Sequence, residues 1–341
     1  MGKESVIKRV YRDHYRPLLF FSLFLVVLSL AVIGYKLATT GDFIDKGVSL
    51  KGGITLTVLT EQPVDPEELA AYLHEQLPKA DVNVRTTAEA GKQKSVLIEA
   101  SDTTSEELLA ALQEKIPDSK NKNNIAIDST DPVLGALSFI QTMKAVYIAF
   151  LFMAIVVFLY FGEHLWAKII ALALAVVSGI MMFHATSTVV AIVSLIIGAA
   201  VFFLCFKYSI PSIAVILAAF SDIMFAIACL NIIGMKLSIA GIAAFLMLIG
   251  YSVDTDILLS VRVMKRKEGS IFDRVLGAFK TGITMSLAAL AAVIVTLIFV
   301  NSDVIRQIMM VLLFGLIADM IFTWFQNAGI LRWHFERKGK T

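Results

Sequence analysis

Charged residues are scarce in this chain. Only 17% of its 341 residues are Asp, Glu, Lys or Arg, whereas 57% are hydrophobic, which is far more apolar than soluble globular domains. This composition excludes an ordinary soluble protein and predicts a polytopic α-helical membrane protein. The formal net charge is only +2, and the basic residues gather at the ends of apolar runs. Such clusters are typical of membrane topology signals, so nucleic-acid binding is not indicated.

Residues for redox, metal or hydrolytic chemistry are also few. The two cysteines, Cys205 and Cys229, lie within apolar runs without a CxxC pair or a nearby His at ligand spacing, so we expect both to serve packing. No Walker A, HExxH or GxSxG pattern occurs, which leaves ATP hydrolysis, zinc proteolysis and serine hydrolysis without support. We therefore expect no enzymatic activity and no bound cofactor or metal.

Eight apolar runs are each close to the roughly 20 residues that a membrane helix needs. The first follows a basic tail at residues 1–16 and lacks the short apolar core and cleavage site of a secretory signal, so we interpret it as an anchor. The positive-inside rule then places this tail and the tail at 328–341 in the cytoplasm of a cell membrane protein. The predicted spans are 17–35, 143–161, 167–183, 188–206, 212–232, 237–259, 275–300 and 304–324.

The later spans form a predicted bundle over residues 142–327. Within it, the segment 162–210 holds two apolar runs that are joined by only four residues, beginning at His184. Such a short linker fits either two full crossings or a re-entrant pair. Both arrangements give the later helices the same orientation.

Residues 36–141 are polar enough to form a folded domain outside the cytoplasm. The patterns predict strands and helices in the order βαββαβ, which is the order of the ferredoxin-like α+β fold. A helix opened by Asp and Pro and a helix with a Ser/Thr N-cap support this assignment. The expected elements are a strand at 48–59, a helix at 65–77, two strands around residues 90–91, a helix at 103–116 and a strand at 124–129.

Two glycines, Gly52 and Gly53, lie inside the first expected strand. A glycine pair within a strand predicts a bulge or a close approach of another backbone. Phosphate binding by these glycines is the alternative, although no GK[ST] sequence follows them.

Several carboxylates lie inside the apolar runs. A charged side chain at the centre of a membrane helix costs roughly 2.5–3.5 kcal/mol, so such residues usually face a bundle interior and mark a function. Asp254 and Asp256 share the span 237–259, and Asp222 and Asp319 lie in other spans. We expect these four residues to form a layer that binds and releases protons. Alternatively, they pair only structurally or lie at the headgroup level.

Asp254 and Asp256 are expected to have unequal roles. They are about 200° apart around a helix, so only one of them can face a given neighbour. Asp254 falls deeper in the membrane and is the expected main proton site, with Lys280 of the next span as its counter-charge. Small or hydroxyl-bearing residues that suit close packing and a polar interior surround the two carboxylates: Gly250, Tyr251, Ser252 and Thr255.

Six segments carry a resemblance to a known family, and GYSVDTD, within the fourth of them, is the most specific element. The segments are SLKGGIT, PVLGALSFIQTMKAVYIAFLFMAIVVFLYF, PSIAVILAAFSDIMFA, LMLIGYSVDTDILLSVRVMKR, KTGITM and NAGILRWHFERK. Through these segments, which extend over most of the chain, it resembles the SecF family of protein-export membrane proteins in its archaeal form, within the RND superfamily.

This resemblance implies a function in the Sec pathway. It implies a heteromeric complex with SecD at the Sec translocon channel, in a lipid membrane, that aids the late export of unfolded polypeptides by using the proton motive force. The proton-linked aspartate of the family would align at Thr255, between Asp254 and Asp256, so either residue can take its place; sodium is the other candidate ion. The family's arginine in the following span corresponds to Lys280, which keeps a cation but loses bidentate geometry. The family core has six spans, so two spans are additional.

Three other functions remain open. An intramembrane aspartyl protease also needs two carboxylates, but GYSVDTD lacks its Gly-x-Gly-Asp pattern. An RND-type proton-coupled exporter of lipids or small molecules usually has two halves with large outer domains, whereas this chain has one half and one small domain. A structural translocon subunit would use the carboxylates for packing only.

Overall fold

The computed structural model describes residues 14–60, 62–78, 80–89, 92–265, 269–300 and 302–337. Several predicted features lie outside the described residues. These are most of the N-terminal tail at 1–16, the turn at 90–91, the basic residues Arg266 and Lys267, and the end of the C-terminal tail from residue 338.

In the described part of the chain, eight helices are long and apolar enough to cross a membrane. This confirms the predicted fold class of a polytopic helical protein. The last of these helices is continuous through a short π-helical segment. The helices are α2 (Tyr15–Thr40), α6 (Pro132–Phe161), α7 (Leu165–Phe183), α8 (Thr188–Tyr208), α9 (Ile210–Ile233), α10 (Ile239–Lys265), α11 (Ile271–Phe299) and the run α12 (Asp303–Ile321), η3 (Phe322–Asn327) and α13 (Ala328–Arg337).

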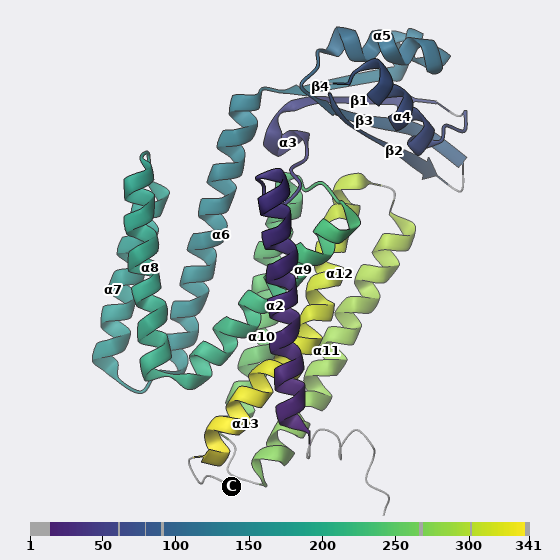
Figure 1. Ribbon diagram of the computed structural model, residues 1–341. Coiled ribbons are helices and arrows are strands. Elements are labelled where there is room, and N and C mark those ends of the chain that lie inside the picture. The colour runs from purple at the N-terminus through teal and green to yellow at the C-terminus, as the bar shows by residue number, and fades with distance from the viewer. Residues whose placement is uncertain are drawn as a thin grey trace, which may run out of the picture.

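Helices α9, α10 and α12 form the centre of the bundle, and α2, α6 and α11 pack around them (Figure 1). The α7–α8 hairpin lies at one edge, beside α6, and packs through small buried residues such as Ala167, Ala171 and Ala175. At 1.5 Å per residue, α7 and α8 are about 28 and 31 Å long, which matches the roughly 30 Å hydrocarbon core of a bilayer. Both helices are therefore long and apolar enough to cross a membrane.

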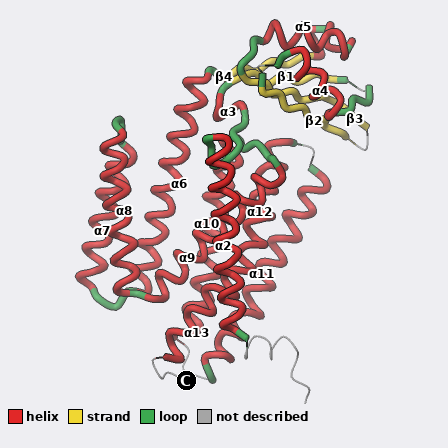
Figure 2. The backbone as a smooth tube through the Cα atoms, viewed as in Figure 1, coloured by secondary structure: helices red, strands yellow, loops and turns green. Residues whose placement is uncertain are grey.

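The α+β domain sits at one end of the bundle (Figures 1 and 2). Its four strands form an antiparallel sheet in the order β2-β3-β1-β4, and α4 and α5 cover one face through a core that includes Leu73 and Leu112. This arrangement confirms the ferredoxin-like prediction. The elements are β1 (Gly53–Leu59), α4 (Pro66–Gln76), β2 (Asp81–Glu89), β3 (Lys92–Ser101), α5 (Ser105–Lys115) and β4 (Ile125–Thr130), with short 3-10 turns at Pro117–Lys120 and Lys122–Asn124.

Both domain helices begin where capping residues predict. The Asp65 side chain accepts hydrogen bonds from the backbone N–H groups of Glu67 and Glu68, and Thr104 and Glu107 form a capping box at the start of α5. These side chains satisfy N–H groups that have no partner within a helix.

The first expected strand begins later than its sequence pattern predicts, because residues Val48–Lys51 form a helical turn, α3. The backbone N–H of Gly47 bonds to the carbonyl of Leu237 at 2.7 Å, which fixes this segment on the bundle. Gly52 has a φ of +87°, and a Cβ there would lie 2.3 Å from the Cα of Pro132. Glycine at this position therefore lets the start of α6 pass closely beside the end of α3.

We call the contact region of residues 42–51, Asp81 and residues 234–238 the junction, because it joins the α+β domain to the bundle. Lys236 donates to Asp81 at 2.9 Å, and Lys51 lies 3.8 Å from the same carboxylate. Partial burial opposes the ionisation of Asp81, but the hydrogen bond and charge of Lys236, with the charge of Lys51, outweigh it and hold the pKa of Asp81 below its usual value. Two further pairs, Lys46 with Asp42 and Lys36 with Asp45, complete the junction.

Candidate functional site: three carboxyl groups inside the bundle

Three of the four predicted carboxyl groups meet in the interior of the bundle. Asp222 lies on α9, Asp256 on α10 and Asp319 on α12, and each has an exposed fraction of 0%. Among the described residues, no lysine, arginine or histidine forms an ion pair with any of them. Ionised carboxylates that are buried without a cation are costly, so their hydrogen-bond partners decide what this site can do.

One hydroxyl group links two of these carboxyl groups. The Oγ1 atom of Thr323 lies 2.8 Å from Oδ1 of Asp256 and 2.9 Å from Oδ1 of Asp319. A threonine hydroxyl has one hydrogen and can donate to only one acceptor at a time. Both contacts are full hydrogen bonds only when one of the two carboxyl groups supplies a hydrogen of its own.

Neutral donors complete the surroundings. Asp256 also accepts from Asn327 Nδ2 at 2.7 Å, and Asp319 accepts from Ser286 Oγ at 3.2 Å. Asp222 accepts from Ser252 Oγ at 2.5 Å. One oxygen of Asp222 and one of Asp256 are buried without a hydrogen-bond partner. The site therefore has spare acceptor atoms and neutral donors, an arrangement that can hold a proton in more than one place.

The π-helical turn η3 places the donors Thr323 and Asn327 toward the carboxyl groups. Wider turns of this kind are rare and are frequently found at functional sites. The same turn directs Gln326 to Ser221 of α9. Trp324 packs against Gly282 of α11, where a Cβ would lie 2.3 Å from the indole ring.

Four donors of the site were not expected from the sequence: Ser286, Thr323, Gln326 and Asn327. The sequence does contain a signal for these four residues, because polar side chains in an otherwise apolar span usually face a bundle interior. The π-helical turn that brings three of them to one side has no comparable signal.

The structure places Asp254 and Lys280 apart from the three buried carboxyl groups. Asp254 is exposed on the outer face of α10, and Lys280 is exposed on α11 and forms no ion pair with the buried carboxyl groups among the described residues. The physical reason is the angle of about 200° between positions two apart on a helix, which turns Asp254 outward when Asp256 faces inward. Asp256 is therefore the better candidate for the main site.

The other residues of the predicted motif divide between the two faces of α10. Ser252 is buried and bonds to Asp222, whereas Gly250 is exposed, and no atom lies within 4 Å of the position that a Cβ would occupy there. Tyr251 is half-buried between them. Gly52 and Gly53 follow the junction segment 42–51, far along the chain from this site, and they allow close contacts with the backbone of Pro132 and Ala100. No group of three or more His, Cys, Asp or Glu side chains suited to a metal ion occurs in the described ranges.

Several known proteins are similar to this chain in sequence. The family model "Protein export membrane protein SecD/SecF, C-terminal" matches residues 175–337. Protein-export membrane protein SecF of Methanothermobacter thermautotrophicus is 32% identical over 342 residues, covering 97% of this chain and 96% of that protein. SecF of Thermococcus gammatolerans is 35% identical over 302 residues, which cover 86% of this chain and 78% of that protein.

The fold also matches a solved structure. The crystal structure of SecDF, a translocon-associated membrane protein from Thermus thermophilus, superposes with a TM-score of 0.61 at 16% identity. The match covers 98% of this chain and 39% of that one, so the chain spans well under half of SecDF. The relatives are named as membrane proteins of protein export. On this sequence similarity over nearly its whole length, the chain belongs to the SecF family of protein-export membrane proteins.

Proposed function

We propose that this chain, an auxiliary subunit of Sec protein export by its family, uses proton movement through Asp222, Asp256 and Asp319 to promote late translocation of unfolded polypeptides. The observation that carries the proposal is the Thr323 hydroxyl shared between two carboxyl groups. This geometry needs a proton on one of the carboxyl groups. Among the described residues, no lysine, arginine or histidine forms an ion pair with these carboxyl groups. A bound proton, and not a fixed positive charge, must therefore neutralise one of them.

Loss of that proton would change the packing of the bundle. A second negative charge beside Thr323 has no cation to offset it, so it must gain water or other donors. Because all three carboxyl groups have an exposed fraction of 0%, water can reach them only if α10 and α12 separate or rotate. Alternate opening toward the two sides of the membrane would then couple proton passage to helix movement.

Contacts from α12 offer a route from this movement to the α+β domain. Gln307 on α12 donates to the carbonyl of Lys236 at 2.6 Å and accepts from the backbone N–H of Ser238 at 2.9 Å. The ammonium group of Lys236 in turn donates to Asp81 of the domain at 2.9 Å. A shift of α12 would therefore act directly on the junction, and through it on a domain that we propose contacts the exported chain.

The charge distribution supports an orientation with the α+β domain outside and both termini in the cytoplasm. Basic residues lie at the end of the bundle that is remote from the domain, including Lys265, Arg274 and Arg337. The positive-inside rule assigns this end to the cytoplasm.

We also propose that the outer face of α10 contacts SecD at the translocon. Asp254 is exposed within a membrane span, where contact with lipid alone would cost roughly 2.5–3.5 kcal/mol. Gly250, one turn away, leaves open space for close helix packing. Cysteine crosslinking from position 250 to SecD tests this contact, and labelling by lipid probes alone would contradict it.

The proton proposal is tested by gradient-dependent export in vesicles that contain SecD. Asp256→Asn keeps size and hydrogen bonding but cannot ionise, so we expect the gradient-dependent part of export to be lost. Asp254→Asn is the matched control two residues away, and we expect it to retain that part. Co-purification with SecD shows that each variant assembles. Collapse of the proton gradient and of the sodium gradient in separate samples identifies the ion. Normal export by an assembled Asp256→Asn variant would contradict proton coupling and leave a structural role.

A further inference from the structure

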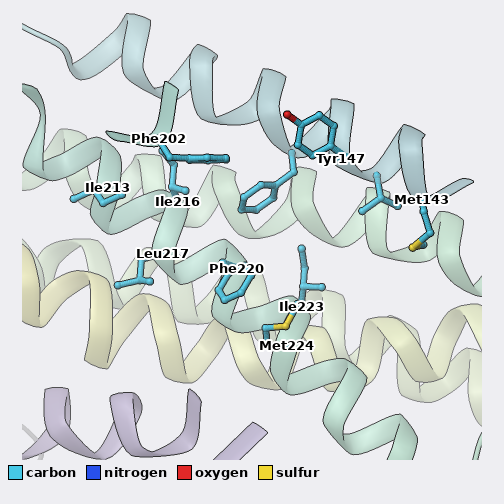
Figure 3. Close-up of a pocket in the computed structure, with 11 residues that line it drawn as sticks. Met143, Tyr147, Phe202, Ile213, Ile216, Leu217, Phe220, Ile223 and Met224 are labelled. Carbon is cyan, nitrogen blue, oxygen red and sulfur yellow. The ribbon is translucent and has the colours of Figure 1, made fainter. Parts of the chain in front are cut away.

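An apolar groove lies in the seam between the α7–α8 hairpin and the rest of the bundle. It has a volume of about 530 Å³ and is lined from α6, α8 and α9 (Figure 3). The only side-chain oxygen on its lining belongs to Tyr147, and this hydroxyl bonds to Ser178 Oγ at 2.7 Å and to the Ser194 carbonyl at 3.0 Å, on the hairpin. The groove thus offers water no partner, and apolar spaces of this kind bind apolar ligands.

The groove has the length of one membrane leaflet. Along α9 its lining runs from Ile213 to Met224, which is 11 rises of 1.5 Å, or about 16 Å. That is about half of the roughly 30 Å hydrocarbon core. Met224 lies near the middle of α9, and Ile213 lies near the start of α9, at the bundle end remote from the α+β domain.

A polar pocket follows at that end. It has a volume of about 350 Å³, and its lining includes His164, Lys207, Ser209 and Ile210. Ile210 and Ile213 are less than one helical turn apart, so the pocket continues the groove along α9. Trp166 packs against Tyr208 with ring centroids 5.1 Å apart, and aromatic residues of this kind mark the headgroup level of a membrane.

We propose that the groove and the pocket together bind one membrane phospholipid with an anionic headgroup. The hydrocarbon chain occupies the groove, and the phosphate lies beside the ammonium group of Lys207, which is exposed at the headgroup level. His164 and His334 add nitrogen donors to the pocket, and Glu163 lies on its rim as an opposing charge. The lipid would fill the seam between the hairpin and the core, which gives the two additional spans a role that does not depend on proton coupling.

Binding can be measured by native mass spectrometry of the full-length purified chain titrated with dioleoylphosphatidylglycerol or dioleoylphosphatidylcholine. We expect one phosphatidylglycerol to remain bound with preference over phosphatidylcholine. Leu217→Trp fills the groove and should weaken binding by about tenfold or more. The matched control Leu195→Trp places the same side chain on the outer face of α8 and should bind as the wild type does.

Two further variants, one of them with a matched control, complete the test. Met143→Trp fills the same groove from α6 and replaces Leu217→Trp if that variant does not fold. Lys207→Gln should abolish the preference for phosphatidylglycerol, whereas Arg306→Gln, at the opposite end of the bundle, should retain it. Wild-type affinity in both groove-filling variants, or equal binding of the two lipids by the wild type, would overturn the proposal.

Discussion

The carboxyl groups at the junction and those in the bundle interior have different kinds of partner. At the junction, Asp42, Asp45 and Asp81 each have a lysine partner. In the interior, Asp256 and Asp319 have only hydroxyl and amide partners among the described residues. A carboxylate paired with lysine stays ionised and acts as a fixed contact, whereas one held by neutral donors can gain or lose a proton. Under the proposed function, the junction would transmit movement and the bundle interior would bind and release protons.

The largest effect is expected from a change that opens the sealed interior. Gly282→Ala puts a Cβ 2.3 Å from the Trp324 ring, so we expect it to destabilise the bundle by about 3 kcal/mol, the upper end of overpacking costs. Gly250→Ala meets no atom within 4 Å and should change stability by less than about 0.5 kcal/mol. Thermal unfolding in detergent compares the two. Equal stability would show that the interior is not tightly closed.

A smaller effect is expected when the shared hydroxyl is removed. Thr323→Val keeps the shape but leaves Asp256 and Asp319 with one donor fewer, at a cost of about 1–2 kcal/mol, and it should reduce gradient-dependent export. Thr284→Val removes a hydroxyl on the exposed face of α11, where we expect a change below about 0.5 kcal/mol. Unfolding and export are measured on both variants. Full export by Thr323→Val would remove the hydroxyl from the mechanism.

The smallest effect is expected at the junction, in the Asp81 ion pair. Because the folded pKa of Asp81 lies below its usual value, the pair stabilises docking above about pH 3.9, and this contribution is lost as the pH falls through the folded pKa. Solvent screening limits it to less than about 1 kcal/mol. Asp81→Asn should weaken docking slightly at neutral pH and remove this acid dependence.

Docking is measured by the yield of a disulfide engineered between the domain and the bundle, as a function of pH. The control Asp102→Asn changes an exposed carboxylate nearby and should retain the acid dependence. An Asp81→Asn profile that matches the wild type would show that this ion pair does not hold the domain.

Most of the fold could be predicted from the sequence, because long apolar runs and capping residues act locally. The span 237–259 and the N-terminal cap of the helix at Thr104 could be predicted without knowing which segments pack against them. Residues Val48–Lys51 form a helical turn instead of a strand, next to a hydrogen bond between Gly47 and Leu237, which is 190 residues away in the chain. Contacts at such a distance override a local strand preference.

The site was only partly predictable for a similar reason. The cost of charge in a membrane identifies Asp222, Asp256 and Asp319, but it identifies Asp254 equally well. Helical spacing requires that Asp254 and Asp256 face different ways, and it does not say which one faces inward. The π-helical turn decides this, since Thr323 and Asn327 both bond to Asp256.

The central claim is that a proton is shared between the carboxyl groups around Thr323. Infrared spectroscopy of protein with isotope-labelled aspartate measures this most directly, because protonated and ionised carboxyl groups absorb at different frequencies. The account predicts a protonated carboxyl band in the resting wild-type protein that weakens in Asp319→Asn and is unchanged in Asp254→Asn. A spectrum in which every labelled carboxyl group is ionised would contradict it.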